Sequence, residues 1–174
     1  MPRLAAVDVH YPSSGGACAA AVVASDRRFG TVVAEYVHRL ATVAPYEPGR
    51  FFARELPALR AVLALAGAVD LVVVDGYVDL DPDGRPGLGA HVYAESGCPV
   101  VGVAKSAFRA ATHAIPVRRG ASARPLYVTS AGIGLDEAAA MVAGMAGTYR
   151  LPAALRRVDS LARGLSPGPS CPGR

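Results

Sequence analysis

The stretch LVVVDG, residues 71–76, decides the fold prediction because a run of aliphatic residues ends abruptly in a carboxylate. Four consecutive aliphatic side chains are typical of a strand that is buried on both faces of a sheet. Asp75 follows directly, and a charge at the edge of an apolar core costs free energy unless a partner pairs with it. Two interpretations of Asp75 therefore stand: it caps a turn, or it binds a metal ion.

The length and composition favour one globular domain. A chain of 174 residues can bury a proper core, and an apolar fraction of 52% excludes a disordered protein. No apolar stretch is long enough to span a membrane and the N-terminus lacks a secretory core, so we expect a cytoplasmic protein without membrane contact. Cys18, Cys98 and Cys171 are too scattered for a disulfide framework or a zinc site. We expect a single domain over residues 1–165 and a flexible tail over residues 166–174.

The charge is distributed unevenly along the chain. Residues 1–87 carry eight arginines against ten acids, a net charge of −2, whereas residues 88–174 carry nine arginines and one lysine against four acids, a net charge of +6. Such asymmetry favours a polyanionic partner such as nucleic acid. Lys105 is the only lysine, and lysine differs from arginine where a compact point charge is needed.

Short apolar segments separated by turn-rich loops predict three antiparallel strands, over residues 4–9, 17–24 and 31–39. After them, strands alternate with helices. The further strands are predicted over residues 70–74, 99–104, 113–118 and 125–129, and the helices over residues 51–65, 88–95, 135–146 and 153–163. The predicted fold class is therefore α/β: a mixed sheet, with an antiparallel meander followed by parallel strands, flanked by helices.

A second aspartate sharpens the question that Asp75 raises. Asp8 ends the apolar run over residues 4–7, so the two aspartates meet at one edge of the sheet if their strands are neighbours. Two carboxylates held close together destabilise each other, and a divalent cation such as Mg²⁺ resolves that conflict. The alternative is that each aspartate only caps its own loop.

A third acid falls on an apolar helix face. On a helical wheel, Glu55 lies inside the apolar stripe of the predicted helix over residues 51–65. A carboxylate on the core-facing side needs a partner, and a metal site shared with the two aspartates would supply one. The alternative is an ion pair with Arg54 or Arg60.

Seven stretches carry a resemblance that covers nearly the whole chain in order. They are AAVDVHY with Asp8, PYEPGRFFARELP with Tyr46 and Glu55, VVVDG with Asp75, GLGAHV, PVVGVAKS with Lys105, PLYVT, and YRLPAALRRVD. Together they resemble the endonuclease V family, metal-dependent enzymes that cut nucleic acid near deaminated purines such as inosine. The resemblance implies a ribonuclease H-like fold, which agrees with the predicted mixed sheet, and a role in repair.

The resemblance implies a role for each matching residue. Asp8 and Asp75 correspond to the metal-binding aspartates, with Mg²⁺ as the expected cofactor and Mn²⁺ as an alternative. Glu55 corresponds to the third acid, which holds the metal or its water. Lys105 corresponds to the active-site lysine, which would steady the scissile phosphate or the attacking water. These four residues are the predicted catalytic set.

The resemblance also implies a nucleic-acid surface. Tyr46 corresponds to a wedge that fills the gap left by a flipped base, on a loop shaped by Pro48 and Gly49. The implied substrate is DNA or RNA with a deaminated base, cut to leave a 3′-hydroxyl and a 5′-phosphate. Apart from the resemblance, we expect a monomer, although the sequence itself does not decide the oligomeric state. The arginines expected to contact the phosphate backbone are Arg118, Arg119, Arg124, Arg156 and Arg157.

Two departures from the family pattern leave an alternative open. Ala131 stands where we align a family histidine that approaches the metal, and Tyr77 and Val78 would narrow a base pocket that glycine would leave open. The chain is therefore either an active endonuclease or a nucleic-acid-binding relative with weakened or lost cleavage. Retention of the acids favours the active enzyme, because without a metal they would repel a phosphate.

Overall fold

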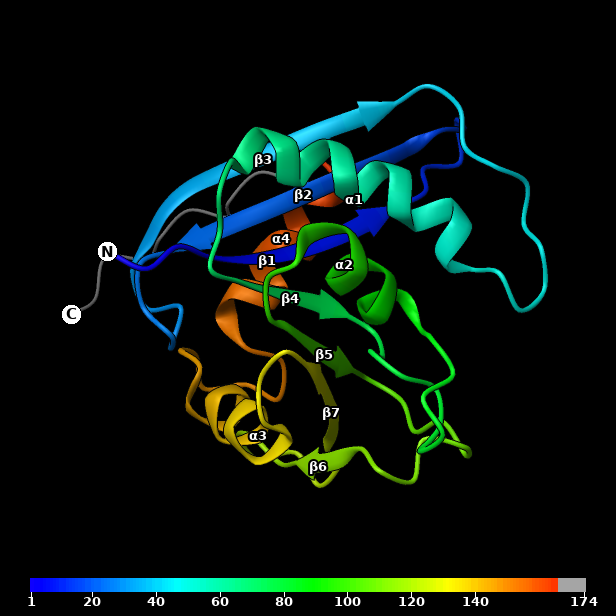
Figure 1. Cartoon of the computed structure of the whole chain (residues 1–174). Helices are drawn as coiled ribbons and strands as arrows, with labels where there is room; N and C mark the ends of the chain where they lie inside the picture. The colour runs from blue at the N-terminus through cyan, green and yellow to red at the C-terminus, as the bar shows by residue number, and fades with distance from the viewer. Residues whose placement is uncertain (166–174) are drawn as a thin grey trace.

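The structure of the protein is a computed structural model that describes residues 1–165. These residues form one seven-stranded sheet with two helices on each face (Figure 1). The predicted tail, residues 166–174, lies outside the described part of the chain. None of the described helices has the length and hydropathy to cross a bilayer. The elements in chain order are β1 (Leu4–His10), β2 (Ala17–Ala24), β3 (Val32–Leu40), α1 (Phe52–Ala66), β4 (Leu71–Asp75), α2 (Leu88–Ser96), β5 (Val100–Ala104), β6 (Ile115–Val117), β7 (Leu126–Ala131), α3 (Leu135–Gly144) and α4 (Ala153–Ala162).

The strand order across the sheet is β3-β2-β1-β4-β5-β7-β6. β1, β2 and β3 form an antiparallel meander, β1, β4 and β5 run parallel, and β7 runs antiparallel to β5 and β6. This is the mixed α/β, ribonuclease H-like architecture that the sequence predicts. β6 is shorter than predicted, and α3 ends at Gly144 rather than at residue 146.

The central strand β4 is apolar throughout because both of its faces are covered. Val72 and Val74 pack in the core beneath α1 and α2, whereas Leu71 and Val73 face the opposite core, which α3 and α4 cover. All four side chains are buried. Successive side chains of a strand point to opposite faces, so a strand between two helical layers has no solvent-facing position. The interpretation of residues 71–74 as a doubly buried strand is confirmed.

Gly102 of β5 lets the loop after β4 approach the sheet closely. A Cβ atom at this position would lie 2.6 Å from the Gly76 carbonyl oxygen, 2.6 Å from Oγ1 of Thr129 and 2.9 Å from the Val78 nitrogen. Thr129 is buried, and its Oγ1 accepts a hydrogen bond of 2.8 Å from the Val78 N–H. The close packing at Gly102 and the hydrogen bond to Thr129 together fix the backbone that follows Asp75.

We expect the substitution Gly102→Ala to destabilise the protein by about 1–3 kcal/mol, because the added methyl group has to displace packed backbone atoms. Urea denaturation measures the change in the free energy of unfolding. Gly144→Ala is the matched control: a Cβ there meets no atom within 4 Å, so stability should stay equal or rise. Equal effects of the two substitutions would contradict the close approach at Gly102.

Candidate active site

Parallel pairing brings the predicted aspartates together at one edge of the sheet. Val7 of β1 is in register with Val74 of β4, so Asp8 and Asp75 follow side by side. β5 runs parallel on the other side of β4, and Lys105 comes directly after it. The arrowheads of β1, β4 and β5 point to the same side of the molecule (Figure 1). The carboxyl ends of these strands therefore form the site.

Glu55 reaches the same edge from α1. It lies one helical turn before Leu59 and two before Val62, which are both buried against the sheet, and it lines a small cavity together with Asp8 and Asp75. The prediction that Glu55 faces the sheet is confirmed.

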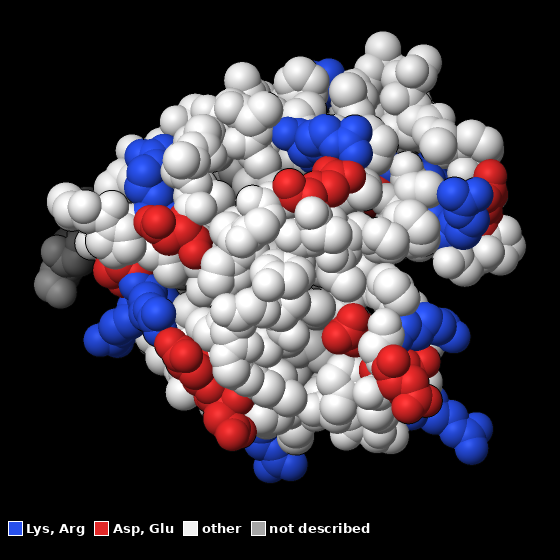
Figure 2. All heavy atoms as spheres, in the orientation of Figure 1, with Lys and Arg blue, Asp and Glu red and all other residues white. Residues whose placement is uncertain are grey.

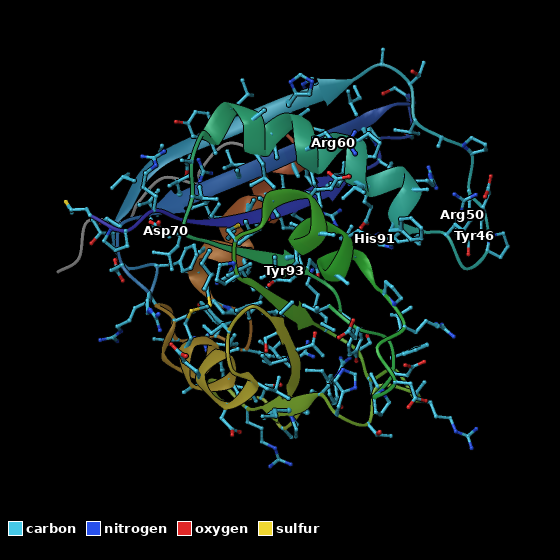
Figure 3. The ribbon with its side chains drawn as sticks, viewed as in Figure 1. Tyr46, Arg50, Arg60, Asp70, His91 and Tyr93 are labelled. Atoms are coloured by element: carbon cyan, nitrogen blue, oxygen red, sulfur yellow. The ribbon has the colours of Figure 1, made fainter. Side chains whose placement is uncertain are left out.

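Of the alternative partners proposed for Glu55, Arg60 is engaged elsewhere, whereas the charge of Arg54 acts on Glu55 and partly lowers its pKa. Arg60 forms a two-pronged ion pair with Glu95 of α2, on the outer surface (Figure 3). The Arg54 guanidinium lies over the ring of Tyr11, 4.5 Å from its centroid. Among residues 1–165, no ion pair joins Glu55 to either arginine.

Burial and mutual repulsion favour the protonated forms of two acids at this edge. Burial and the charge of Asp75 raise the pKa of Asp8 to about 7, although a hydrogen bond from the Val9 N–H partly lowers it. Burial and the charges of Asp8 and Asp75 raise the pKa of Glu55 to about 8. A cation that enters such a site is stabilised by the carboxylates and in turn favours their ionised forms.

The amine of Lys105 lies beside the acids at this edge of the sheet. Its Nζ lies 2.8 Å from Oδ2 of Asp75. Burial lowers the pKa of Lys105, but the hydrogen bond to Asp75 and the charges of Asp75 and Asp8 outweigh burial, so the net pKa is raised. Lys105 is therefore protonated at neutral pH.

The acids do not form a complete cation cage by themselves. Within residues 1–165, no three His, Cys, Asp or Glu side chains are arranged so that they could hold a metal ion. One oxygen of Asp75 is bonded to Lys105, and Asp8 and Glu55 interact with Asp75 through charge. A cation here would take one or two carboxylates and complete its shell with water and substrate oxygens, as Mg²⁺ usually does.

A pocket of about 250 Å³ adjoins the acids, between the start of α1 and the loop that joins β4 to α2. Glu55, Asp75 and Phe52 belong to its lining, and Phe52 is backed by His91, whose ring stacks on it at 3.8 Å between centroids (Figure 3). Figure 2 shows the surface hollowed on this side, between the loop before α1 and the loops after β4 and β5.

Of the two residues predicted to narrow this pocket, only Tyr77 lines it. Its hydroxyl donates a hydrogen bond of 2.7 Å to the Ser106 carbonyl and accepts one of 2.9 Å from the Phe108 N–H. Val78 is fully buried and packs against Gly89, so the prediction that it narrows the pocket is wrong. The pocket wall is thus tied to the loop that follows Lys105.

The predicted wedge loop projects from the body of the molecule ahead of α1, with Tyr46 near its tip (Figure 3). Tyr46 is 60% exposed and meets Phe51 edge to face, with ring centroids 6.3 Å apart. Pro48 is exposed, and Gly49 adopts a positive φ of 78° and lines the pocket. The loop therefore presents an aromatic side chain beside the pocket entrance.

Arg119 is not placed to contact nucleic acid. It is 7% exposed, and its guanidinium donates hydrogen bonds to backbone carbonyls of the segment that precedes α4. The prediction for Arg119 is wrong because burial removes its charge from the surface, whereas Arg118 is exposed and remains a predicted contact. The acceptor carbonyls belong to Met145, Gly147, Tyr149 and Arg150.

Comparison with known proteins agrees with this geometry. Residues 1–123 match the family model described as Endonuclease V. The chain is 36% identical over 181 residues to endonuclease V of Azotobacter vinelandii, covering 91% of this chain and 81% of that protein. It is 34% identical over 183 residues to the Streptomyces coelicolor enzyme, covering 92% and 78%. The chain belongs to the endonuclease V family.

Solved structures of endonuclease V share the fold. The Streptomyces avermitilis structure superimposes with a TM-score of 0.79 at 31% identity, covering 94% of this chain and 81% of that one. A variant of Ciona intestinalis endonuclease V, bound to a 23-mer DNA that contains an inosine followed by a ribo-adenosine, gives 0.80 at 19% identity, covering 93% and 84%. At that lower identity, the second comparison supports the fold alone.

The interpretation that Ala131 replaces a metal-approaching family histidine is wrong. β7 runs antiparallel to β5, so Ala131 pairs with Val100 at the start of β5, whereas Tyr127 pairs with Ala104 beside Lys105. The four residue steps along the strand from one pair to the other span about 13 Å. Ala131 therefore lies at the edge of the sheet opposite the acids.

Sequence reasoning missed a fourth acid, Asp159 of α4. Its charge raises the pKa of both Asp8 and Lys105, so it lies within electrostatic range of the site. Its carboxylate also accepts a hydrogen bond of 3.0 Å from Arg163, one turn later in the chain. The signal was present but weaker than that of Glu55, because Asp159 borders, rather than lies inside, the apolar stripe formed by Leu155, Val158 and Ala162.

In the metal-free protein, we expect Asp8→Asn and Glu55→Gln to stabilise the fold increasingly as the pH rises from about 4 to about 8. Folding raises both pKa values, so the stability of the protonated forms is complete below the ordinary values of 3.8 and 4.5 and is lost as the pH rises through about 7 and 8. The neutral amides of the two variants do not titrate, so the variants do not lose this stability as the pH rises. The expected difference in the free energy of unfolding is on the order of a few kcal/mol. Thermal unfolding in EDTA across this range measures it.

The matched control is Asp83→Asn, in the exposed turn between β4 and α2. Its stability relative to the parent protein should not change over the same pH range. A stabilisation by Asp8→Asn that is independent of pH would contradict the raised pKa that burial and the charge of Asp75 give Asp8.

Proposed function

We propose that the protein is a metal-dependent endonuclease that hydrolyses a phosphodiester bond near a deaminated purine, with inosine as the base it selects. The observation that carries the proposal is the meeting of Asp8, Glu55 and Asp75 beside Lys105, with two pKa values raised toward neutrality. Membership of the endonuclease V family supports it. The inosine-containing DNA bound to the Ciona protein supports a nucleic-acid partner.

The donor set fits a hard divalent cation such as Mg²⁺, with Mn²⁺ as the second choice. Asp8 and Asp75 would hold the ion and Glu55 one of its water molecules, because these ions prefer carboxylate oxygens. The bound ion supplies a Lewis acid that activates water and offsets charge on the phosphate. Burial and mutual repulsion raise the pKa of Asp8 and Glu55, and the charge of a bound ion would oppose both effects, so both acids would be ionised in the loaded enzyme.

Lys105 acts on the phosphate. Its protonated amine can leave Asp75 for a phosphate oxygen when substrate enters, which neutralises the substrate and leaves the Asp75 carboxylate available to the cation. The backbone of Lys105 is fixed for this role, because the Arg150 guanidinium donates to its carbonyl oxygen. The position of the positive charge is therefore set before the substrate binds.

The pocket beside Glu55 receives the flipped base. Its 250 Å³ lies below the roughly 300–1,000 Å³ of sites for drug-sized ligands, so it suits one base rather than a larger group. Rotating a base out of a strand costs a few kcal/mol, and the cost is lowest for a mispaired base. The ring of Tyr46 would fill the space that the base leaves. Tyr77 forms the pocket wall.

The alternative of a non-cleaving relative loses its main support. It depended on the absence of a histidine at residue 131, and this position lies away from the acids. Asp159 adds a fourth negative charge near the site instead. Four acids near a phosphate-binding lysine favour a protein that binds a metal over one that binds nucleic acid alone.

We expect Mg²⁺- or Mn²⁺-dependent nicking of labelled single- and double-stranded DNA and RNA that contain one inosine, and none in EDTA. Asp75→Asn should lower the rate by about 100-fold or more, because the cation loses a ligand. Gel analysis of the products measures it, with Asp83→Asn as the control that keeps parental activity. Binding without nicking in either metal would leave the non-cleaving relative as the correct account.

We expect Asp159→Asn to lower kcat by about 10-fold or more, because it removes a negative charge that acts on both Asp8 and Lys105. Ala131→His should leave kcat unchanged. Arg163→Gln removes the ion-pair partner of Asp159 and controls for the stability of α4. A higher kcat in Ala131→His than in the parent protein, or equal losses in the Asp159 and Arg163 variants, would contradict the assignment.

A further inference from the structure

An aromatic side chain stands exposed on the segment that leads into α4. Tyr149 is 63% exposed, and the Cζ atom of Arg156 lies 4.3 Å from its ring centroid. An arginine behind one side of a largely exposed ring leaves ring surface available to a planar ligand. Proteins that bind single strands use such aromatic platforms, with arginine beside them, to stack bases of any sequence.

The platform is rigid. The buried Arg119 guanidinium donates hydrogen bonds to the carbonyls of Tyr149 and Gly147. Gly120 packs against the same segment so closely that a Cβ atom would lie 2.6 Å from the Thr148 carbonyl oxygen. A ring on a fixed backbone loses little conformational entropy when a base stacks on it.

The platform adjoins the acids on the side opposite the base pocket. Arg150, the next residue, donates to the Lys105 carbonyl. Leu151 and Leu155 line a small cavity together with Asp8, Asp75 and Lys105. The base pocket lies at the start of α1, whereas Tyr149 precedes α4, which packs on the other face of the sheet. The segment that carries Tyr149 therefore lies across the acids from the base pocket.

Positive charge surrounds the platform. Arg118, Arg124 and Arg156 are exposed, and none of them forms an ion pair within residues 1–165. Arg118 lies two residues before Gly120, and the Arg124 carbonyl accepts a hydrogen bond of 3.0 Å from Arg150. An aromatic ring among unpaired arginines fits a nucleotide, whose base stacks while its phosphates meet the guanidinium groups.

We propose that Tyr149, backed by Arg156, stacks on a base of the bound strand beyond the scissile phosphate, on the side remote from the base pocket. The inference rests on the proposed function, because the acids define where the scissile phosphate lies. Tyr46 and Tyr149 then contact the bound strand on opposite sides of the acids. Tyr149 is a positioning residue and touches no reacting atom.

The first test is binding of a fluorescent single-stranded inosine oligonucleotide to the full chain in EDTA, where cleavage does not interfere. Tyr149→Ala and Tyr149→Leu should weaken binding by about 5- to 150-fold, the range for loss of one stacked base. Tyr149→Phe should restore affinity to within about twofold, since it keeps the ring. Tyr93→Ala removes another partly exposed tyrosine, on α2 (Figure 3), and should bind as the parent does. Thermal unfolding of each variant controls for folding.

The second test locates the stacked base. Oligonucleotides shortened to end at the cleaved bond should bind the parent and Tyr149→Ala equally, because they lack the nucleotide that stacks. In the full-length oligonucleotide, 2-aminopurine at one position beyond the cleaved bond should change its emission on binding, and Tyr149→Ala should abolish that change.

The outcomes separate this inference from the proposed function. Normal binding by Tyr149→Ala, failure of Tyr149→Phe to restore affinity, or equal loss on shortened oligonucleotides would overturn the stacking role, even if inosine cleavage is found. The protein could also cleave no oligonucleotide at all while Tyr149→Ala still weakens binding and Tyr149→Phe restores it. In that case the stacking role stands and the proposed endonuclease activity fails.

Discussion

The parallel pairing of β1 with β4 sets two carboxylates side by side at the edge of an apolar core, and the rest of the site responds to that constraint. Two like charges about 4 Å apart repel by about 4 kcal/mol at an effective dielectric constant of about 20, far more than a surface ion pair contributes. The ion pair between Lys105 and Asp75 reduces this repulsion, and the raised pKa of Asp8 favours its uncharged form. If the protein acts as proposed, a cation beside Asp8 and Asp75 and a phosphate beside Lys105 would replace both of these arrangements.

The sequence predicted most of the site because its acids interrupt apolar patterns. Asp8 and Asp75 each end an aliphatic run, and Glu55 breaks the apolar stripe of its helix. Such interruptions are costly without a partner, so they are visible in a single sequence. Asp159 carries the same signal more weakly, because it borders its stripe, and the turn-to-turn ion pair with Arg163 makes it resemble an ordinary surface charge.

The errors arose where the direction of a chain segment decides the outcome. Ala131 follows the motif PLYVT, but whether it lies near the acids depends on β7 running antiparallel to β5, which no local pattern reveals. Arg118 and Arg119 are neighbours of the same type, yet one is exposed and the other buried. The alternation of a strand continues past Val117, so the chain turns every second side chain inward. The partners of Arg119 are backbone carbonyls, and these carry no sequence signature.

Hydrogen bonds to loop backbones couple the pocket to the catalytic edge. The Tyr77 hydroxyl joins the loop after β4 to the loop after β5, bonding Ser106 and Phe108 just beyond Lys105. Arg150 bonds the Lys105 carbonyl from the other side. Tyr77, which lines the pocket, is therefore connected by hydrogen bonds to the loop that follows Lys105. If the protein acts as proposed, this connection fixes the distance between the pocket and the lysine, so the position of the base in the pocket would determine which phosphate meets the acids, without readout of the surrounding sequence.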